Sequence, residues 1–295
     1  MRNAVVTLVA LLVLVANAHA GLEVIRNVEY GKGGGHSLLL DIVRPNPLPT
    51  NATPAVIFIH GGAWRGGDKN HAPTRFLAER GYFVASINYR LSGEAPFPAA
   101  VEDCKCAVRW LRSNAAKYNV DPDGIGVWGA SAGGHLAEFL GTTTDDPRYE
   151  GTGGWTNASS RVSAVVSFFG PSDFTAGIGK FRNADGSRGN YEVVKFLGGL
   201  PADKPDVYRD ASPLTHVDKM SAPMLLVHGD QDPVVPLEQS TRMANALREA
   251  GVNVKFIVVT NGVHGFLLNQ VMPISPRRAE IQKAVVEWFD THLRK

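Results

Sequence analysis

Residues 129–133 read Gly-Ala-Ser-Ala-Gly and place a serine, Ser131, between small neighbours. They follow an apolar run over residues 125–128 and precede a helix-like segment over residues 135–140. A serine on a tight strand-to-helix turn needs small neighbours, because the backbone there is strained and a large side chain two positions away would clash. The helix that follows aims backbone N–H groups at negative charge developing beside the serine. The pattern therefore predicts that Ser131 is a nucleophile, with a helix-capping serine in an ordinary glycine turn as the alternative.

Two later motifs supply the partners that a serine nucleophile needs. Strand-like residues 224–227 end at His228-Gly-Asp-Gln-Asp-Pro233, and residues 252–259 run into Gly262-Val-His-Gly-Phe266. A serine hydroxyl is a poor nucleophile until a neutral imidazole takes its proton, and a carboxylate on the far ring nitrogen fixes the tautomer of that imidazole. We expect His264 to be the base and Asp232 the orienting acid, with Asp230 as the nearest rival. Each follows the carboxyl end of a predicted strand, where open α/β sheets place their ligands.

A glycine-rich turn, His60-Gly-Gly-Ala-Trp64, directly follows strand-like residues 55–59. A strand that ends in consecutive glycines leaves backbone N–H groups to face a ligand rather than a partner strand. The indole of Trp64 lies next to these amides in the sequence. It could line a substrate pocket, and packing in the core explains it equally well.

These four motifs together resemble those of the α/β-hydrolase superfamily, and more narrowly those of the hormone-sensitive-lipase-like and BD-FAE-like carboxylesterases, which include acetyl and feruloyl esterases. The resemblance extends over the chain from residue 21 onward. It implies that the backbone N–H groups of Gly62, Ala63 and Ala132 form an oxyanion hole, and that His60 orders the glycine loop by hydrogen bonding. Members often carry a third glycine where this chain has Ala63. Because alanine resists a positive φ, the contribution of Ala63 is left open.

The apolar runs predict an α/β fold. Residues 22–30 and 36–43 suit a hairpin, because a glycine-rich segment over residues 31–35 separates them. Further strands are expected at residues 55–59, 82–87, 124–128, 164–169, 224–227 and 252–259. With helices between them, these strands predict an α/β-hydrolase fold, a mostly parallel sheet of about eight strands with helices on both faces.

The clearest predicted helix begins near Pro98. Its apolar residues recur at spacings of three and four, which predicts one stripe facing the sheet: Val101, Cys104, Val108, Leu111 and Ala115. Cys104 and Cys106, which are the only cysteines of the chain, lie two positions apart on this helix. Their side chains therefore diverge, and we expect no disulfide between them.

Residues 170–221 interrupt the regular pattern with turn-forming residues. We expect a short cap insertion over the site, within a single hydrolase domain over residues 21–295. A surface loop without regular structure is the alternative. Four aromatic residues favour the cap, because a solvated linker does not need them: Phe174, Phe181, Tyr191 and Phe196.

The first residues are expected to be a secretory signal peptide. Arg2 precedes an apolar run over residues 4–15, and Ala-His-Ala at 18–20 matches a cleavage pattern, so residues 1–20 would be removed before Gly21. The run falls short of the roughly 20 residues needed to span a bilayer, although a membrane anchor or a buried first helix is the alternative. The sequence thus predicts an exported protein, periplasmic or secreted, with no membrane anchor after cleavage.

The charge of the chain and the spacing of its potential metal-binding residues do not predict a nucleic-acid, membrane or metal partner. The chain has 30 Lys and Arg against 28 Asp and Glu, a net charge of +2, with no run of like charge. We therefore expect neither nucleic acid nor an anionic membrane as a partner. No spaced cluster of histidines and carboxylates predicts a metal site, and we expect no metal and no cofactor.

The sequence as a whole predicts a serine carboxylesterase that forms an acyl-enzyme on Ser131. A cap rich in glycine and polar residues offers little apolar wall, so short-chain acyl esters are the expected substrates. The resemblance adds small-molecule or polysaccharide-linked esters, including acetyl and feruloyl esters. Two alternatives are a serine peptidase of the prolyl-oligopeptidase type and a non-catalytic binding protein with a hydrolase fold, although a binding protein has no chemical need for these motifs.

Overall fold

The computed structural model describes residues 21–176, 190–266 and 272–294. The expected signal peptide, residues 1–20, lies outside this part, as do residues 177–189 of the expected cap. The described residues form one eight-stranded sheet with the order β1-β2-β4-β3-β5-β6-β7-β8. Its strands are β1 Gly21–Gly33, β2 His36–Asn46, β3 Thr53–Ile59, β4 Phe83–Ile87, β5 Val120–Ala130, β6 Ala164–Phe168, β7 Met224–Gly229 and β8 Val254–Val259.

Strand pairing makes the sheet mostly parallel, as the sequence predicted. β1 and β2 form an antiparallel hairpin through Gly34 and Gly35, whose φ values of 57° and 83° suit a tight two-residue turn. β2 also pairs antiparallel with β4, and the other neighbours pair in parallel. The register sets Ile59 of β3 beside Gly129 of β5. The loops that follow these two strands therefore start at the same edge of the sheet.

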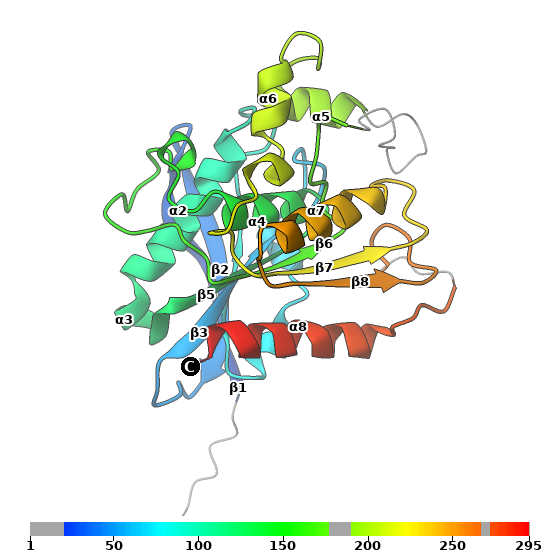
Figure 1. Ribbon diagram of the computed structural model, residues 1–295. Coiled ribbons are helices and arrows are strands. Elements are labelled where there is room, and N and C mark those ends of the chain that lie inside the picture. Colours follow the sequence, from blue (N-terminus) through cyan, green and yellow to red (C-terminus); the bar gives the residue numbers. More distant parts are fainter. Residues whose placement is uncertain (1–20, 177–189, 267–271, 295) are drawn as a thin grey trace, which may run out of the picture.

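Helices cover both faces of the sheet, which completes the α/β-hydrolase fold (Figure 1). In Figure 1, α2, α4 and α7 lie above the sheet and α8 lies below it. The helices are α1 Arg75–Ala78, α2 Ala99–Ser113, α3 Ala115–Tyr118, α4 Ala132–Thr142, α5 Asn190–Leu197, α6 Pro205–Asp210, α7 Glu238–Glu249 and α8 Arg278–Leu293, with short 3-10 helices at Lys69–His71, Pro147–Tyr149 and Pro213–His216.

The two faces of the sheet bury two separate hydrophobic cores. Along β3, Ile57 and Ile59 point into the core shared with α2, α4 and α7, whereas Val56 and Phe58 point into the core shared with α1 and α8. This alternation follows from the two-residue period of a strand. Because β3 and β5 are buried on both sides, their carboxyl ends form a rigid base for the loops that follow.

Helix α2 differs from its predicted form in two ways. The sequence predicted one buried stripe, but the structure also buries polar side chains outside that stripe, namely Asp103, Lys105 and Arg109. Lys105 and Arg109 are covered by the segment over residues 143–160, which follows α4. Helix α2 also ends at Ser113, so Ala115 belongs to α3. Both cysteines of α2 are buried and free, as expected.

The described part of residues 170–221 contains α5, α6 and the 3-10 helix at Pro213–His216. Figure 1 shows α5 and α6 at the top of the molecule, on the side of α4 away from the sheet. Phe174 and Phe196 are buried here, whereas Tyr191 is exposed and Phe181 lies outside the described residues. Within the part of the chain that the structure describes, no helix has both the length and the apolar character to cross a membrane.

Candidate active site

Ser131 occupies a sharp turn between the last residue of β5 and the first residue of α4. Its φ of 56° and ψ of −122° are strained for a side-chain-bearing residue, at a cost of about 1–3 kcal/mol. The flanking glycines are sterically required. A Cβ at Gly129 would lie 2.0 Å from the carbonyl oxygen of Gly133, and a Cβ at Gly133 would lie 2.0 Å from that of Ile59. The small neighbours seen in the sequence therefore let the chain turn tightly and present the serine.

A continuous chain of hydrogen bonds joins Ser131, His264 and Asp232. Ser131 Oγ lies 2.9 Å from His264 Nε2, and His264 Nδ1 lies 2.7 Å from Asp232 Oδ2. Because a carboxylate can only accept, Nδ1 carries the proton and Nε2 is left to accept from the serine hydroxyl. The Phe169 ring meets the His264 ring nearly edge-on, with 4.7 Å between the ring centroids. The structure thus brings together the three residues that the sequence singled out.

The Asp232 carboxylate is fully buried and held by several donors. Its Oδ1 accepts hydrogen bonds from the backbone N–H groups of Val234 and Val235, at 2.8 Å and 2.9 Å. Burial by itself raises the pKa of Asp232, but hydrogen bonds with His228 and His264 outweigh it and hold the pKa below its usual range. The carboxylate is therefore ionised where it faces His264.

The rival acid, Asp230, does not replace Asp232 in this arrangement. Its backbone N–H donates to Val259 O at 3.0 Å, at the edge of the sheet. The carboxylate that contacts His264 belongs to Asp232. Of the two acids that the sequence left open, the structure therefore supports Asp232.

His228 is a residue for which the sequence suggested no role. Its Nε2 donates to Val235 O at 2.9 Å and lies 3.4 Å from Asp232 Oδ2, while its Nδ1 lies 2.8 Å from Ser240 Oγ. The ring thus ties the loop that carries Asp232 to α7. Its position at the end of β7, four residues before Asp232, was the available sequence signal.

The glycine loop after β3 has an unusual backbone. Gly62, Ala63 and Trp64 have φ values of 115°, 52° and 55°. Alanine resists this region, yet Ala63 occupies it, so the loop is held in place by other contacts. A Cβ at the adjacent Gly61 would lie 3.3 Å from Ser131 Cβ, which shows how closely the loop approaches the serine.

Ala132 supplies a second source of backbone N–H groups beside Ser131. It is the first residue of α4, and the first four N–H groups of a helix have no partner within the helix. The N–H of Ser131 itself donates to Phe168 O at 2.8 Å. The Ser131 amide is therefore engaged with β6, whereas the Ala132 amide has no acceptor within α4.

His60 and Trp64 both hold the glycine loop. His60 Nδ1 lies 2.7 Å from Gly61 O, and the ring stacks on Tyr89 with the centroids 4.3 Å apart, which confirms that His60 orders the loop. Burial lowers the pKa of His60. Trp64 is only 4% exposed and stacks on Phe196 of α5. Of its two possible roles, core packing is the one that these contacts describe.

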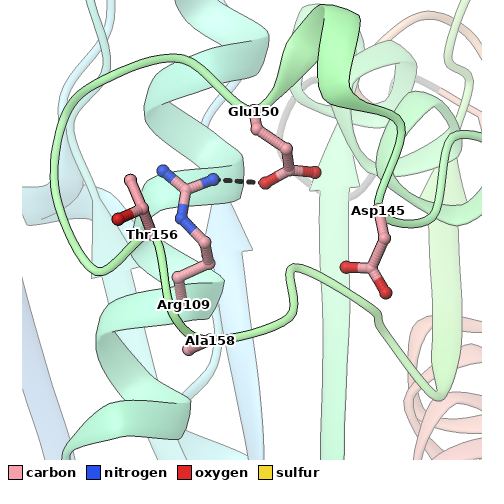
Figure 2. Close-up of a pocket in the computed structure, with 5 residues that line it drawn as sticks. All are labelled: Arg109, Asp145, Glu150, Thr156 and Ala158. Atoms are coloured by element: carbon pink, nitrogen blue, oxygen red, sulfur yellow. Dashed lines mark hydrogen bonds and ion pairs between the residues drawn. The ribbon is translucent and has the colours of Figure 1, made fainter.

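Figure 2 shows a polar pocket beside α2, lined by Arg109, Asp145, Glu150, Thr156 and Ala158. Its volume of about 210 Å³ is below the roughly 300 Å³ at which ligand pockets begin. The Arg109 guanidinium pairs with Glu150 and donates to Gly154 O, so its charge is neutralised within the protein. We therefore assign the residues of this pocket a structural role. Among residues 21–176, 190–266 and 272–294, no three His, Cys, Asp or Glu side chains are placed to hold a metal ion.

A serine on a strained strand-to-helix turn, with a histidine and an acid on loops after later strands of a parallel sheet, defines the α/β-hydrolase class. Within that class, the BD-FAE family model matches residues 40–247. The chain belongs to the BD-FAE family.

Relatives and solved structures agree with this assignment. Esterase LipQ of Mycobacterium tuberculosis is 32% identical over 249 residues, which cover 81% of this chain and 56% of LipQ. The chain spans little more than half the length of the curated mycobacterial esterases that it matches at similar identity. A truncated carbohydrate esterase from gut microbiota has a TM-score of 0.77 and 32% identity, covering 92% of this chain and 97% of that one. An acetyl ester-xyloside bifunctional hydrolase from Caldicellulosiruptor lactoaceticus has a TM-score of 0.70 and 26% identity, covering 86% and 88%.

Proposed function

We propose that this protein is a serine carboxylesterase that hydrolyses short-chain acyl esters through an acyl-enzyme on Ser131. The observation that carries the proposal is the pair of hydrogen bonds from Ser131 Oγ to His264 Nε2, 2.9 Å, and from His264 Nδ1 to Asp232 Oδ2, 2.7 Å. A nucleophile, a base and an orienting acid in this geometry match what acyl transfer requires. Membership of the BD-FAE family and the names of the esterase relatives support the same reaction class.

In the proposed reaction, Ser131 Oγ attacks the ester carbonyl carbon while His264 Nε2 takes the hydroxyl proton. Asp232 stabilises the imidazolium that forms. His264 then gives the proton to the leaving alcohol, and the acyl group stays on Ser131. A water molecule, deprotonated by His264, attacks the acyl-enzyme and releases the acid with a free serine.

The negative charge on the carbonyl oxygen needs preorganised donors. We assign this task to the backbone N–H groups of Gly62, Ala63 and Ala132, because the loop and the start of α4 both lie against Ser131. Removal of one such donor in other serine hydrolases costs about 10²–10³ in kcat. The strained φ of Ala63 is consistent with a backbone shaped for this function.

For the natural substrate, we propose acetyl or feruloyl esters on polysaccharide. Two structural neighbours support this, one named a carbohydrate esterase and the other an acetyl ester-xyloside bifunctional hydrolase. Short acyl groups also suit the expected cap, because each further methylene contributes about 0.8 kcal/mol only where an apolar wall receives it.

A substrate panel tests this proposal. One purified sample is assayed on nitrophenyl esters from acetyl to decanoyl, on acetylated and feruloylated xylan, and on peptide amides, with and without a chelator. We expect the highest kcat/KM at acetyl to butyryl, release of acetate or ferulate from xylan, and no effect of the chelator. A maximum at decanoyl, cleavage of peptide amides in place of esters, or activity that depends on a divalent ion would overturn the proposal.

We also propose that the protein is exported and that its mature form begins at Gly21. The support is the charged residue, apolar run and Ala-His-Ala pattern in residues 1–20. Mass spectrometry of the protein from the native host tests this directly. A mature N-terminus at Gly21 in the periplasm or medium is the expected result, and an intact Met1 in the membrane fraction would contradict it.

A further inference from the structure

The Trp64 indole makes a hydrogen bond that lies outside the Ser131, His264 and Asp232 chain. Its Nε1 donates to His135 Nδ1 at 3.2 Å, and His135 Nε2 lies 2.8 Å from Ala211 O. A carbonyl oxygen can only accept, so the His135 proton is on Nε2 and Nδ1 has the lone pair that receives the indole N–H. Burial lowers the pKa of His135 to about 4, which keeps the ring neutral at neutral pH. The bond is therefore a fixed feature of the folded protein.

Aromatic rings and the backbone also hold Trp64. The indole stacks on Phe196 of α5, with centroids 4.5 Å apart and planes inclined by 10°, and meets Phe174 at 5.7 Å. Its carbonyl oxygen accepts from Ser92 N–H at 2.7 Å. Trp64 is thus fixed at both its side chain and its main chain.

This anchorage matters because the backbone around it is strained. Ala63 and Trp64 are two consecutive non-glycine residues with positive φ, 52° and 55°. Each such residue costs roughly 1–2 kcal/mol, so the loop would relax if nothing held it. The buried indole is the largest side chain of the loop, and its contacts oppose that relaxation.

His135 connects this loop to the serine. Its backbone N–H donates to Ser131 O at 3.0 Å, while its ring accepts from Trp64. One residue of α4 therefore contacts both the turn that presents Ser131 and Ala132 and the loop that presents Gly62 and Ala63. It sets the position of one group of amides relative to the other.

We propose that Trp64 is a positioning residue, whose N–H bond to His135 fixes the orientation of the Gly62 and Ala63 amides toward the oxyanion. This inference rests on the proposed esterase function. It gives Trp64 a role in stabilising the transition state, through the loop amides, rather than in binding the substrate. The indole itself is packed away from solvent.

Trp64→Phe tests the proposal, since it keeps an aromatic ring and removes the N–H. We expect kcat and kcat/KM for a nitrophenyl acetate to fall together by about tenfold or more, the sign of an interaction made only in the transition state. Inhibition by a trifluoromethyl ketone, which forms a tetrahedral adduct on the serine, is expected to weaken by a similar factor. A partly unfolded sample would lose active sites without changing that inhibition constant.

Trp288→Phe is the matched control. Trp288 is also buried, 6% exposed, but lies on α8, and its Nε1 makes no hydrogen bond with the described residues. We expect its kcat/KM and its trifluoromethyl ketone constant to stay within about twofold of wild type, because Trp288 packs in the core on the other face of the sheet from Trp64.

A pair of His135 variants tests the bond from its other end. The amide oxygen of an asparagine reaches the position of Nδ1 and can accept there, whereas the amide nitrogen of a glutamine reaches the position of Nε2 and can donate there. His135→Asn keeps an acceptor for Trp64, and we expect it to retain most of the activity. His135→Gln keeps only the group near Ala211, and we expect it to match Trp64→Phe. Equal activity of the two variants, or wild-type kcat/KM and inhibition in Trp64→Phe, would overturn the proposal.

Ser131→Ala separates this inference from the function on which it rests. If Ser131→Ala is inactive and Trp64→Phe behaves as wild type, only the positioning role of Trp64 is wrong. If Ser131→Ala keeps wild-type turnover, the proposed function is wrong and the inference falls with it.

Discussion

Two groups of buried polar residues differ in whether their hydrogen bonds leave any donor or acceptor available to a substrate. In the first, which we call the α2 cluster (Lys105, Arg109, Glu150), Lys105 Nζ donates to Glu150, Ser160 and Thr143 O, so all three of its hydrogens are used. Arg109 is likewise paired with Glu150. Around Ser131, by contrast, His264 Nε2 faces the serine hydroxyl, and we propose that the amides of the glycine loop face the same position beside the serine. Charge density alone therefore does not mark a site, whereas groups that converge on an open position do.

The backbone supports the same distinction. Lys105 and Arg109 project from a regular helix, α2. Ser131, Ala63 and Trp64 have positive φ, which costs free energy and persists only where surrounding contacts fix it. Positive φ also occurs at Asp145 and Trp155, in the segment over the α2 cluster, so what distinguishes the proposed site is that its strained residues are the ones that carry the hydroxyl and the loop amides.

The largest expected effect is that of Ser131→Ala. Loss of the nucleophile is expected to lower kcat by about 10⁴-fold or more, because the three residues act as a unit. The unfolding midpoint is expected to stay near that of wild type. Steady-state kinetics and thermal unfolding on the same sample measure both quantities. A folded variant with wild-type kcat would show that the region around Ser131 is no more catalytic than the α2 cluster.

Asp232→Asn is expected to be nearly as severe. An amide in place of the carboxylate can favour the wrong tautomer of His264, which costs about 10⁴-fold in kcat in a comparable triad. Asp230→Asn is the matched control, because Asp230 lies two residues away and does not contact His264. Its kcat is expected to remain within about tenfold of wild type. The reverse ranking would reassign the acid to Asp230.

A substitution in the α2 cluster is expected to lower the stability of the protein and to leave its catalysis unchanged. Glu150→Gln leaves the buried Lys105 and Arg109 without their carboxylate, and we expect a loss of about 2–3 kcal/mol in the free energy of unfolding. The side chain of Glu150 is 24% exposed, which places the cost below that of a fully buried pair. Denaturant unfolding measures the loss. The kcat/KM is expected to be unchanged, and a large fall in kcat/KM would show that the cluster takes part in catalysis.

Glu138, on α4, is a buried carboxyl group whose pKa is raised, whereas the pKa of Asp232 is lowered. Burial raises its pKa to about 8, although it accepts hydrogen bonds from Ser167 Oγ and Ser172 Oγ at 2.6 Å and 2.7 Å. Its usual value is 4.5, so between pH 4.5 and about 8 the folded state keeps a proton that the unfolded state releases. The stability that this proton provides is present below pH 4.5 and is lost as the pH rises to about 8.

This contribution has a slope of at most about 1.4 kcal/mol per pH unit. Glu138→Gln replaces the acid with a neutral side chain of the same shape and removes the titration. The free energy of unfolding of wild type and variant, measured from pH 5 to pH 8, is expected to diverge in favour of the variant as the pH rises. Parallel curves would show that Glu138 is ionised in the folded protein.

Much of the fold followed from the sequence because its signals are local. The apolar runs predicted all eight strands, since a strand buried on both faces needs a continuous apolar run, as in β6 and β7. The order of serine, acid and histidine after successive strands predicted that Ser131, Asp232 and His264 would meet. The structure brings them within hydrogen-bond distance, and their catalytic roles stay a proposal.

Other features depend on partners that are distant in sequence. The sequence predicted only the stripe of α2 that faces the sheet, and Lys105 and Arg109 are also buried because residues 143–160 fold over them. The bond between Trp64 and His135 joins residues 71 positions apart, so no local pattern shows it. The positive φ of Ala63 runs against its own preference and is set by these contacts. At Ala63, tertiary contacts thus override local preference.

The central claim, an acyl-enzyme on Ser131, is tested most directly by trapping it. The protein is mixed with an acetyl ester, quenched in acid within the first turnover and digested, and its peptides are analysed by mass spectrometry. We predict one acetyl group, carried by Ser131 and absent from Ser131→Ala. Hydrolysis without acetylation of Ser131, or an acetyl group that forms and turns over on another residue, would contradict the account.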